Sequence, residues 1–429
     1  MWRRFSQGNT SASVNDLIKG YEMKSSIKAI ICILALVTVV VIAMFAYGFI
    51  ETGNSQLPKT REVHLFQMSA SDVETYGLYY PVTFIFTIPT GSTSLKAWYS
   101  YDSTNWSELF QRQSEEFFNG EDCVRFDYTQ VKAYVSIGFK GHTSLYIKIT
   151  DNQNLAIETT YLQVAKYYDN RHCAVTSHND DYGLGGGAHL ALIEEFQKRK
   201  LWYGCAVITA FASWNDWNSL QTQVNEGYVE VQSHFVNHSF YSTLSDSQVW
   251  GEIQGSRDAI LGNITNMPYG QYVSVLLVPN IGITDRERSY TGKAGYLVIK
   301  DDGETTNQYS DWYTATYKGE VHGIFPSMFT TTMGSWFVDQ SDDDRDGIIN
   351  GMDENYLNKK FDEVYNSGGI YELRSHPGYV NVSESYCQNH LNYISGQKDC
   401  WYVPVGQIYC YHYVALFVQH SSVTKKNFA

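Results

Sequence analysis

The stretch Cys173-Ala-Val-Thr-Ser-His-Asn-Asp-Asp181 runs from an apolar, strand-like segment into two neighbouring aspartates. A second strand-like segment, Tyr228–Gln232, leads to His234-Phe-Val-Asn-His238, and a third, Gly369–Leu373, leads to His376. Catalytic groups of β/α barrels stand at the carboxyl ends of the parallel strands. One carboxylate and two imidazoles at such ends are typical ligands of a divalent-metal site that keeps an open coordination position.

Strand-like and helix-like segments alternate from about residue 171 to residue 420. Helix-like His189–Lys200 follows the first strand, Tyr203–Thr209 is strand-like, and Asp246–Ile260 is a predicted helix with Ser245 as its N-cap. This alternation is typical of parallel β/α units. It predicts an α/β domain over residues 171–420, folded as a distorted (β/α) barrel.

Residues 62–165 have a β pattern instead. Four runs of strand length alternate or are continuously apolar, and turn residues separate them: Val82–Ile88, Leu95–Tyr101, Lys132–Phe139 and Ser144–Thr150. Short strands at this spacing predict a small all-β sandwich. We expect it to act as a spacer, with carbohydrate binding as the alternative.

An apolar segment precedes both domains. Ala29–Ile50 consists mostly of Ile, Val, Leu, Ala and Phe and has roughly the 20-residue length that spans a bilayer. Basic residues dominate its N-terminal side, which predicts a cytoplasmic N-terminus. A cleaved secretory signal is the alternative, but no small-x-small cleavage site closes the run. We expect a cytoplasmic tail (1–28), a transmembrane signal anchor (29–50), a stalk (51–61) and extracytoplasmic domains in a single-pass membrane protein.

The net charge of −14 argues against a nucleic-acid partner. Six cysteines follow the apolar segment, which permits up to three disulfides in an oxidising compartment. The crowding of Cys387, Cys400 and Cys410 predicts at least one local bridge, and buried free thiols are the alternative.

Asparagine sequons predict glycosylation in a eukaryotic host at Asn105, Asn263 and Asn381. Asn237 also lies in a sequon, but it stands between the two histidines of the expected metal site. A glycan there would block the metal, so we expect Asn237 to remain unmodified.

The motifs together resemble the polysaccharide deacetylase family, also called the NodB-homology domain or carbohydrate esterase family 4. Ser177–Gly183 is similar to the family's Thr-Phe-Asp-Asp-Gly motif, His234–Ser239 to its His-(Ser/Thr)-x-x-His-(Ser/Pro) motif, and Leu373–His376 to its Leu-x-His motif. The resemblance covers roughly residues 171–420. It implies a barrel of the NodB type and removal of N- or O-acetyl groups from a surface or extracellular polysaccharide.

The resemblance also implies roles for individual residues. Asp181, His234 and His238 would hold a divalent metal, normally zinc in this family. Asp180 would be the general base, and His376 the general acid that protonates the departing amine. The alternatives are a catalytically degenerate glycan-binding protein and a structural surface glycoprotein.

Two positions depart from the family pattern. Phe235 replaces the Ser or Thr between the histidines and removes a hydroxyl that would brace the loop. Val278 replaces an arginine that partners the base, and Arg286 or Arg288 could substitute for it. Backbone N–H groups near Pro279 and Asn280 would face the oxyanion.

A second ion site is predicted in the acidic stretch that begins at Asp342. Its carboxylates, glycine and Asn350 follow the spacing of a calcium loop, with a final carboxylate at position 12. The expected ligands are Asp342, Asp344, Asp346, Ile348, Asn350 and Asp353. The alternative is an acidic loop that only faces solvent.

Overall fold

The computed structural model describes residues 62–113, 119–184, 186–279, 284–300, 312–317, 320–326, 329–333 and 351–424. Thr60–Ala429 forms one compact unit. The predicted tail, anchor and stalk lie outside the described residues, as do Asn280 and residues 342–350 of the predicted calcium loop. Within the described ranges, no helix is both long enough and apolar enough to cross a membrane.

The N-terminal part of this unit is a sandwich of two five-stranded sheets. One sheet has the order β20-β1-β8-β3-β4, formed by Gln419–Thr424, Glu62–Gln67, Ser144–Thr150, Lys96–Ser100 and Ser107–Glu108. The other has the order β5-β6-β7-β2-β9, formed by Phe110–Gln111, Cys123–Asp127, Lys132–Ile137, Val82–Thr87 and Thr160–Val164. The four predicted strands are present as β2, β3, β7 and β8, with each end within two residues of its expected position.

Side-chain alternation places the core between these sheets. Leu145, Ile147 and Ile149 of β8 are fully buried, whereas Tyr146 and Lys148 between them are only partly covered. Successive side chains of a strand point to opposite faces of its sheet, so β8 contributes every second residue to the core. Phe66, Phe84 and Phe86 fill the same core.

The end of the chain returns to the sandwich. β20 pairs antiparallel with β1, beyond the helix that completes the α/β domain. His420 Nε2 lies 3.0 Å from Nδ1 of the buried His64, whose Nε2 lies 2.8 Å from Thr159 Oγ1. The predicted α/β domain extended to residue 420, whereas the structure places Gln419 onward in the sandwich sheet.

A curled sheet of parallel strands forms the second part of the unit. Its order is β14-β13-β12-β11-β10-β18-β17, and β19 pairs with β10. In that order the strands are Val298–Lys300, Val275–Leu277, Val229–Ser233, Tyr203–Val207, Cys173–Tyr182, Ile370–Ser375 and Phe329–Met333, with β19 at Cys400–Tyr402. A two-stranded hairpin, β15 (Trp312–Tyr317) and β16 (Glu320–Pro326), precedes β17.

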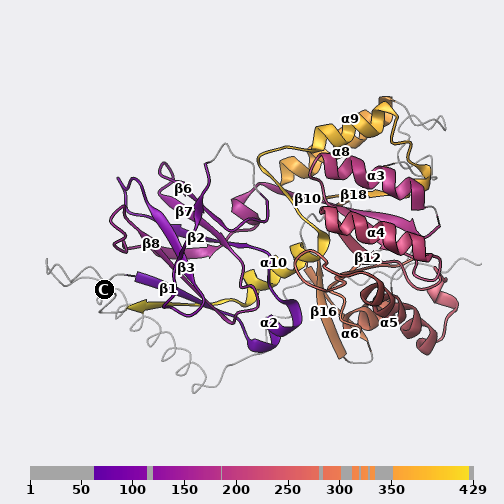
Figure 1. Cartoon of the computed structure of the whole chain (residues 1–429), viewed down its shortest axis with the longest axis horizontal. Helices are drawn as coiled ribbons and strands as arrows, with labels where there is room; N and C mark the ends of the chain where they lie inside the picture. The colour runs from indigo at the N-terminus through magenta and orange to yellow at the C-terminus, as the bar shows by residue number, and fades with distance from the viewer. Residues whose placement is uncertain are drawn as a thin grey trace, which may run out of the picture. The chain divides into compact units, whose positions relative to one another are not determined.

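Helices cover this sheet, and α3 and α4 lie side by side over it (Figure 1). Their bounds are α3 Gly186–Lys198, α4 Trp214–Glu226, α5 Asp246–Asn263, α6 Asp285–Lys293, α8 Gly351–Ser367, α9 Ser385–Ile394 and α10 Val405–Phe417; α2, Ala70–Tyr76, belongs to the sandwich. The predicted helices over 189–200 and 246–260 correspond to α3 and α5.

Side-chain hydrogen bonds explain where two of these helices begin. Ser245 and Gln248 form a capping box at α5, which confirms the predicted N-cap. Glu230 of β12 accepts hydrogen bonds from the backbone N–H groups of Val405 and Gly406, at 3.0 and 2.8 Å. It therefore satisfies two of the unpaired donors at the start of α10.

An ion pair demonstrates how far the sheet curls. Lys300 on β14 and Glu372 on β18 are separated by four strands in the sheet order, yet Lys300 Nζ lies 2.7 Å from Glu372 Oε2. The predicted distorted barrel is thus a curled half-barrel in the described residues, where no pairing joins β14 to β17.

The cysteines do not form the expected local bridge. All six cysteines of the described part are buried and free. Cys387, Cys400 and Cys410 belong to three different elements, α9, β19 and α10, so their nearness in sequence does not bring them together. Cys400 lies instead beside Cys173 on the neighbouring strand β10, with the two sulfurs 3.1 Å apart.

Candidate active site

The residues of the predicted site meet at the carboxyl edge of the parallel sheet. Asp180 and Asp181 are at the end of β10, His234 follows β12, and His376 follows β18. The short 3₁₀ helix Pro377–Tyr379 begins immediately after His376. Parallel strands of one sheet end at the same edge, so the topology brings these side chains together.

Asp181, His234 and His238 form the candidate metal centre. One ligand atom of each lies within 4.8 Å of the others. Asp181 Oδ1 lies 3.5 Å from His234 Nε2 and 3.3 Å from His238 Nε2. The side chain of His234 is 4% exposed, whereas those of Asp181 and His238 are 27% and 32% exposed, so one side of the cluster remains accessible.

These residues fit a divalent ion. Among the described residues, the buried Asp181 Oδ1 has no partner in hydrogen-bond geometry. His234 Nδ1 lies 3.0 Å from the carbonyl oxygen of Leu277, a contact in which the ring donates its proton. This leaves the lone pair of Nε2 directed at the cluster, as in most histidine ligands of metals.

The backbone at the centre has unusual conformations. Asp181, Phe235 and His238 have φ values of 72°, 65° and 56°, in the left-handed region that residues other than glycine seldom adopt. The pairing of β10 with β11 also shifts register between Asn179 and Tyr182. Strained residues of this kind cluster at functional sites, where the surrounding structure holds them in place.

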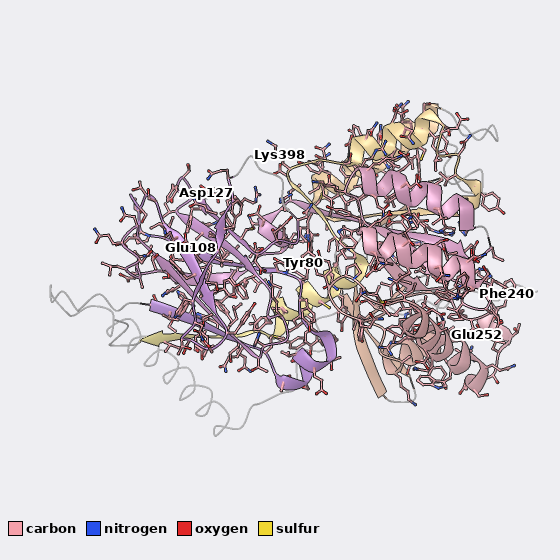
Figure 2. The ribbon with its side chains drawn as sticks, in the orientation of Figure 1. Tyr80, Glu108, Asp127, Phe240, Glu252 and Lys398 are labelled. Carbon is pink, nitrogen blue, oxygen red and sulfur yellow. The ribbon has the colours of Figure 1, made fainter. Side chains whose placement is uncertain are left out.

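Glu252 of α5 braces the loop that carries the histidines. Its carboxylate accepts hydrogen bonds from the backbone N–H groups of Val236 and Asn237, at 2.9 and 2.8 Å, and from Asn237 Nδ2 at 2.8 Å. Figure 2 shows Glu252 on the same side of the domain as Phe240, which follows this loop. Phe235 is fully buried in the core, so packing and Glu252 support the loop without the family's hydroxyl.

Asp180 is paired with Arg374 of β18. Arg374 Nε donates to Asp180 Oδ2 at 3.2 Å, and both side chains are 2% exposed. Burial alone would raise the pKa of Asp180, but the nearby charges of His178, His234, Arg374 and His376 outweigh it and lower the pKa to about 2. Asp180 is therefore ionised at neutral pH.

Arg374 thus supplies a positive charge beside Asp180. The two substitutes suggested by the sequence have other contacts. Arg286 lies 3.5 Å from Asp246 and 2.6 Å from Glu287, and Arg288 lies 3.1 Å from Asp285. The cationic partner of Asp180 is Arg374, which lies on β18, the strand that precedes His376.

The ligand carboxylate and one ligand imidazole affect each other's pKa. Burial by itself would raise the pKa of Asp181. The interactions with His234 and His238 outweigh burial, so the pKa of Asp181 lies below its usual range. Burial lowers the pKa of His234, whereas Asp181 and Asp180 raise it by more. The centre therefore attracts positive charge, as a cation site must.

His376 stands beside both carboxylates. Its Nε2 lies 3.6 Å from Asp180 Oδ2 and 3.9 Å from Asp181 Oδ2, and its side chain is 12% exposed. These distances place His376, the predicted acid, beside Asp180, the predicted base, and next to the candidate metal ligand Asp181.

The oxyanion donors expected near Pro279 and Asn280 stay a prediction. The N–H of Val278 donates to the carbonyl oxygen of Lys300 at 2.9 Å, and proline has no N–H. Asn280 lies outside the described residues.

A buried ionic network lies beneath the site and was not predicted. Lys300, Glu372 and His178 are 8%, 0% and 1% exposed, and His178 Nδ1 lies 3.0 Å from Glu372 Oε1 without hydrogen-bond geometry. The signal in the sequence was Glu372 and Arg374 alternating within the fully buried strand β18. Charged residues in such a strand need partners inside the fold.

The predicted glycosylation sites and Asn237 are alike in being exposed and in donating a hydrogen bond from the side-chain amide. Asn105, Asn263 and Asn381 are exposed, which leaves them accessible to modification. Asn237 uses its side-chain amide to bind Glu252, as described above.

Several solved structures resemble this chain. One is a protein from Mycobacterium smegmatis, provisionally assigned as a polysaccharide deacetylase, with 13% identity and a TM-score of 0.45 over 57% of this chain and 91% of that chain. Another is a family 4 carbohydrate esterase from Streptomyces lividans in complex with acetate, with 14% identity and a TM-score of 0.35 over 54% and 91%. A third is PuuE allantoinase, with 14% identity and a TM-score of 0.45 over 57% and 91%.

No family model and no curated protein matches the sequence. With TM-scores below 0.5, the functional conclusion rests on the geometry of the site. That geometry joins residues from three motifs that resemble those of polysaccharide deacetylases.

Proposed function

We propose that this protein is a metal-dependent carbohydrate deacetylase that removes N- or O-acetyl groups from a surface or extracellular polysaccharide. One observation carries the proposal. Asp181, His234 and His238 converge to within 4.8 Å, and Asp180 and His376 stand beside them. This set supplies three metal ligands, a base and an acid at one edge of a parallel sheet.

Asp181, His234 and His238 would hold the ion, which is zinc by the family resemblance. A bound divalent ion polarises the acetyl carbonyl and lowers the pKa of a nearby water. The partial exposure of Asp181 and His238 leaves room for substrate on that side.

Asp180 and His376 provide the proton transfers. Asp180 accepts a proton from the attacking water, whose oxygen forms a bond to the acetyl carbon. The carbon–nitrogen bond then breaks, and His376 gives a proton to the departing nitrogen, so that acetate and a free amine are released. In an acetyl ester the same proton goes to the departing sugar oxygen.

Arg374 prepares the base for this role. A buried carboxylate without a partner would tend to take up a proton and could no longer accept one from water. Because Arg374 donates to Asp180 Oδ2, the carboxylate stays ionised and its orientation is fixed.

The test is acetate release by the purified full-length chain from acetylated glycans, before and after removal of metal by a chelator. We expect release that stops with the chelator and returns when zinc is added. A chain that binds the metal but releases no acetate from any acetylated glycan would contradict the enzyme assignment. That result would favour the glycan-binding alternative.

The proposal also includes the setting of the enzyme. The apolar segment Ala29–Ile50 supports a single N-terminal membrane anchor with the enzyme outside the cytoplasm. Protease added to sealed cells should digest the C-terminal domains, and their full protection would refute this orientation.

The acidic spacing from Asp342 to Asp353 supports a structural calcium ion, which calorimetric titration with calcium would detect.

A further inference from the structure

A groove separate from the metal centre lies along the sandwich. It has a volume of about 460 Å³ and is bounded by α2 with the turn that follows it and by residues 269–272. This volume is within the range of roughly 300–1,000 Å³ that small-molecule sites occupy. Ligand sites also occur preferentially where two domains meet.

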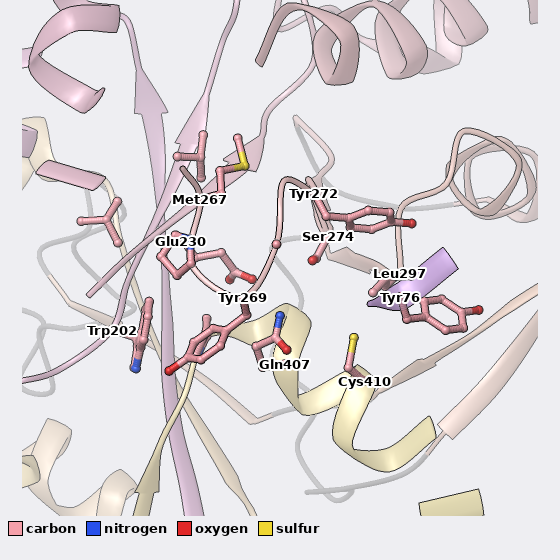
Figure 3. Close-up of a pocket in the computed structure, with 15 residues that line it drawn as sticks. Tyr76, Trp202, Glu230, Met267, Tyr269, Tyr272, Ser274, Leu297, Gln407 and Cys410 are labelled. Carbon is pink, nitrogen blue, oxygen red and sulfur yellow. The ribbon is translucent and has the colours of Figure 1, made fainter. Parts of the chain in front are cut away.

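The groove is distant from the catalytic edge. It shares Tyr76, Tyr269 and Tyr272 with a chamber of about 30 Å³ that extends to Glu230 (Figure 3). Glu230 is near the start of β12, whereas His234 follows its end, about 13 Å away at 3.3 Å per residue. The chamber has room only for a water or two, so a ligand would occupy the outer groove.

Tyrosine rings dominate the walls of the groove. Tyr76, Tyr79, Tyr269 and Tyr272 all line it, and Tyr79 is 44% exposed. Large, exposed aromatic rings offer flat apolar faces with a hydroxyl that can form hydrogen bonds. The C–H faces of sugar rings stack on such surfaces, while sugar hydroxyls bind the polar edges.

The remaining lining favours a ligand rich in hydroxyl groups. Thr75, Thr143 and Gln271 are exposed, polar and uncharged. The hydroxyl of Thr75 donates to Ser71 O and one N–H of Gln271 donates to Ile264 O, so the Thr75 oxygen and the second Gln271 N–H face the ligand's hydroxyls. Among the described residues that line the groove, Glu74 is the only charged one, and none is Lys, Arg or His. A phosphate, sulfate or nucleic acid would have no cation to bind there, and an aliphatic chain would leave the polar groups unsatisfied.

Glycines keep the space around Tyr79 open. Gly77 and Gly270 have φ values of 65° and 119°, which only glycine adopts without strain. A Cβ atom at Gly77 would lie 2.4 Å from Tyr79 Cε2, and one at Gly270 would lie 3.5 Å from Tyr79 Cδ2. Side chains at these positions would crowd the tyrosine and narrow the groove.

We propose that this groove is a second glycan-binding site, which holds a segment of the polysaccharide while another segment reaches the metal centre. The identity of the ligand as a glycan rests in part on the proposed function. The groove gives the sandwich a binding role, where the sequence suggested a spacer. Its ligand is a neutral or amine-bearing sugar chain, because Glu74, the only charged residue among the described ones that line the groove, is negative.

Isothermal titration calorimetry on the full-length chain tests this proposal. The parent for the experiment carries His234→Ala, which disables the metal centre and leaves the groove unchanged. The probes are hexamers of N-acetylglucosamine, of glucosamine and of acetylated xylose. Tyr79→Ala removes the exposed ring, Thr143→Trp fills the groove from its rim, and Tyr128→Ala is a matched control on a sandwich tyrosine that is 42% exposed and lies outside the groove.

We expect the parent to bind at least one hexamer, and both groove variants to weaken that binding about tenfold or more, since an aromatic contact and its buried area contribute roughly that much. Tyr128→Ala should bind as the parent does. The proposal is overturned if no hexamer binds, or if both groove variants bind as tightly as the parent.

Acetate release from the wild-type chain separates this proposal from the proposed function. Binding that depends on Tyr79 in a chain that releases no acetate would support the groove and refute the deacetylase. Acetate release in a chain whose groove binds no hexamer would support the deacetylase and overturn the proposed glycan site in the groove.

Discussion

Replacing Glu372 by Gln should destabilise the protein, because Lys300 would lose its buried anion. Glu372 is fully buried, and its Oε2 lies 2.7 Å from Nζ of Lys300, which is 8% exposed. Removing one partner of a buried ion pair costs about 3–5 kcal/mol of unfolding free energy. Gln has the same size as Glu, so the lost charge accounts for most of the effect.

This cost converts to a change in melting temperature. Unfolding entropy is about 2.1 cal/mol/K per residue, or roughly 0.8 kcal/mol/K over the compact unit Thr60–Ala429. A loss of about 3–5 kcal/mol therefore lowers the melting temperature by about 4–6 °C. Differential scanning calorimetry of the full-length chain measures this shift directly.

A double variant provides the matched control. Glu372→Leu combined with Lys300→Met removes both charges, and replacing a whole buried pair with apolar residues is often close to neutral. The double variant should therefore melt above Glu372→Gln. If the single variant melts within about 1 °C of the wild type, Lys300 and Glu372 do not meet across the curled sheet.

Two further predictions concern the site, and a third concerns the pH dependence of stability. Asp180→Asn should retain the metal but lower kcat about 100-fold or more, as metal analysis and acetate release would show, and unchanged turnover would exclude Asp180 as the base. Arg374→Gln should raise the pKa of Asp180 by about 1–3 units and move the acid limb of the kcat/KM profile upward, and an unmoved limb would refute the pairing. Burial lowers the pKa of His64 to about 4 and that of His390 to about 3, so folding favours their neutral forms. The folded protein therefore has its full stability, as far as these two histidines are concerned, above pH 6.5. As the pH falls toward 4, each histidine lowers the free energy of unfolding by roughly 2–3 kcal/mol. Chemical denaturation at pH 7 and pH 4.5 measures this loss, His390→Gln should reduce it, and equal stability at both pH values would contradict it.

The convergence of Asp181, His234 and His238 was predictable because its signals in the sequence are local. Asp181, His234 and His238 directly follow strand-like segments, and parallel strands bring their carboxyl ends to one edge. The four sandwich strands were also predictable, since side-chain alternation with period two is a property of each segment alone.

The features of the site and the fold that the sequence did not predict depend on tertiary contacts. Glu372 could be interpreted only after the sheet was known to curl, because curling brings Lys300 of β14 to Glu372 of β18. Arg374 could be interpreted only after β10 and β18 were known to be neighbours, because their pairing places Arg374 beside Asp180. Glu252 lies 14 residues beyond His238 on a helix, and a lone glutamate there carries no sequence signal. The return of β20 was missed because Gln419–Thr424 is a mostly polar strand stabilised by its pairing with β1.

The cysteine prediction was wrong for a similar reason. Spacing in sequence suggested a bridge among Cys387, Cys400 and Cys410. In the structure each of them belongs to a different element, α9, β19 and α10 respectively. The register of β10 with β19 determines the neighbour of Cys400, and that register places Cys173 beside it.

The position of a bound zinc ion is the most direct test of the central claim. Anomalous diffraction at the zinc absorption edge, from crystals grown with zinc, would locate the ion. The geometry predicts one strong peak within roughly 2.0–2.2 Å of a carboxylate oxygen of Asp181 and of the Nε2 atoms of His234 and His238. A zinc-loaded protein in which the ion lies elsewhere, or in which these three side chains point apart, would contradict the account.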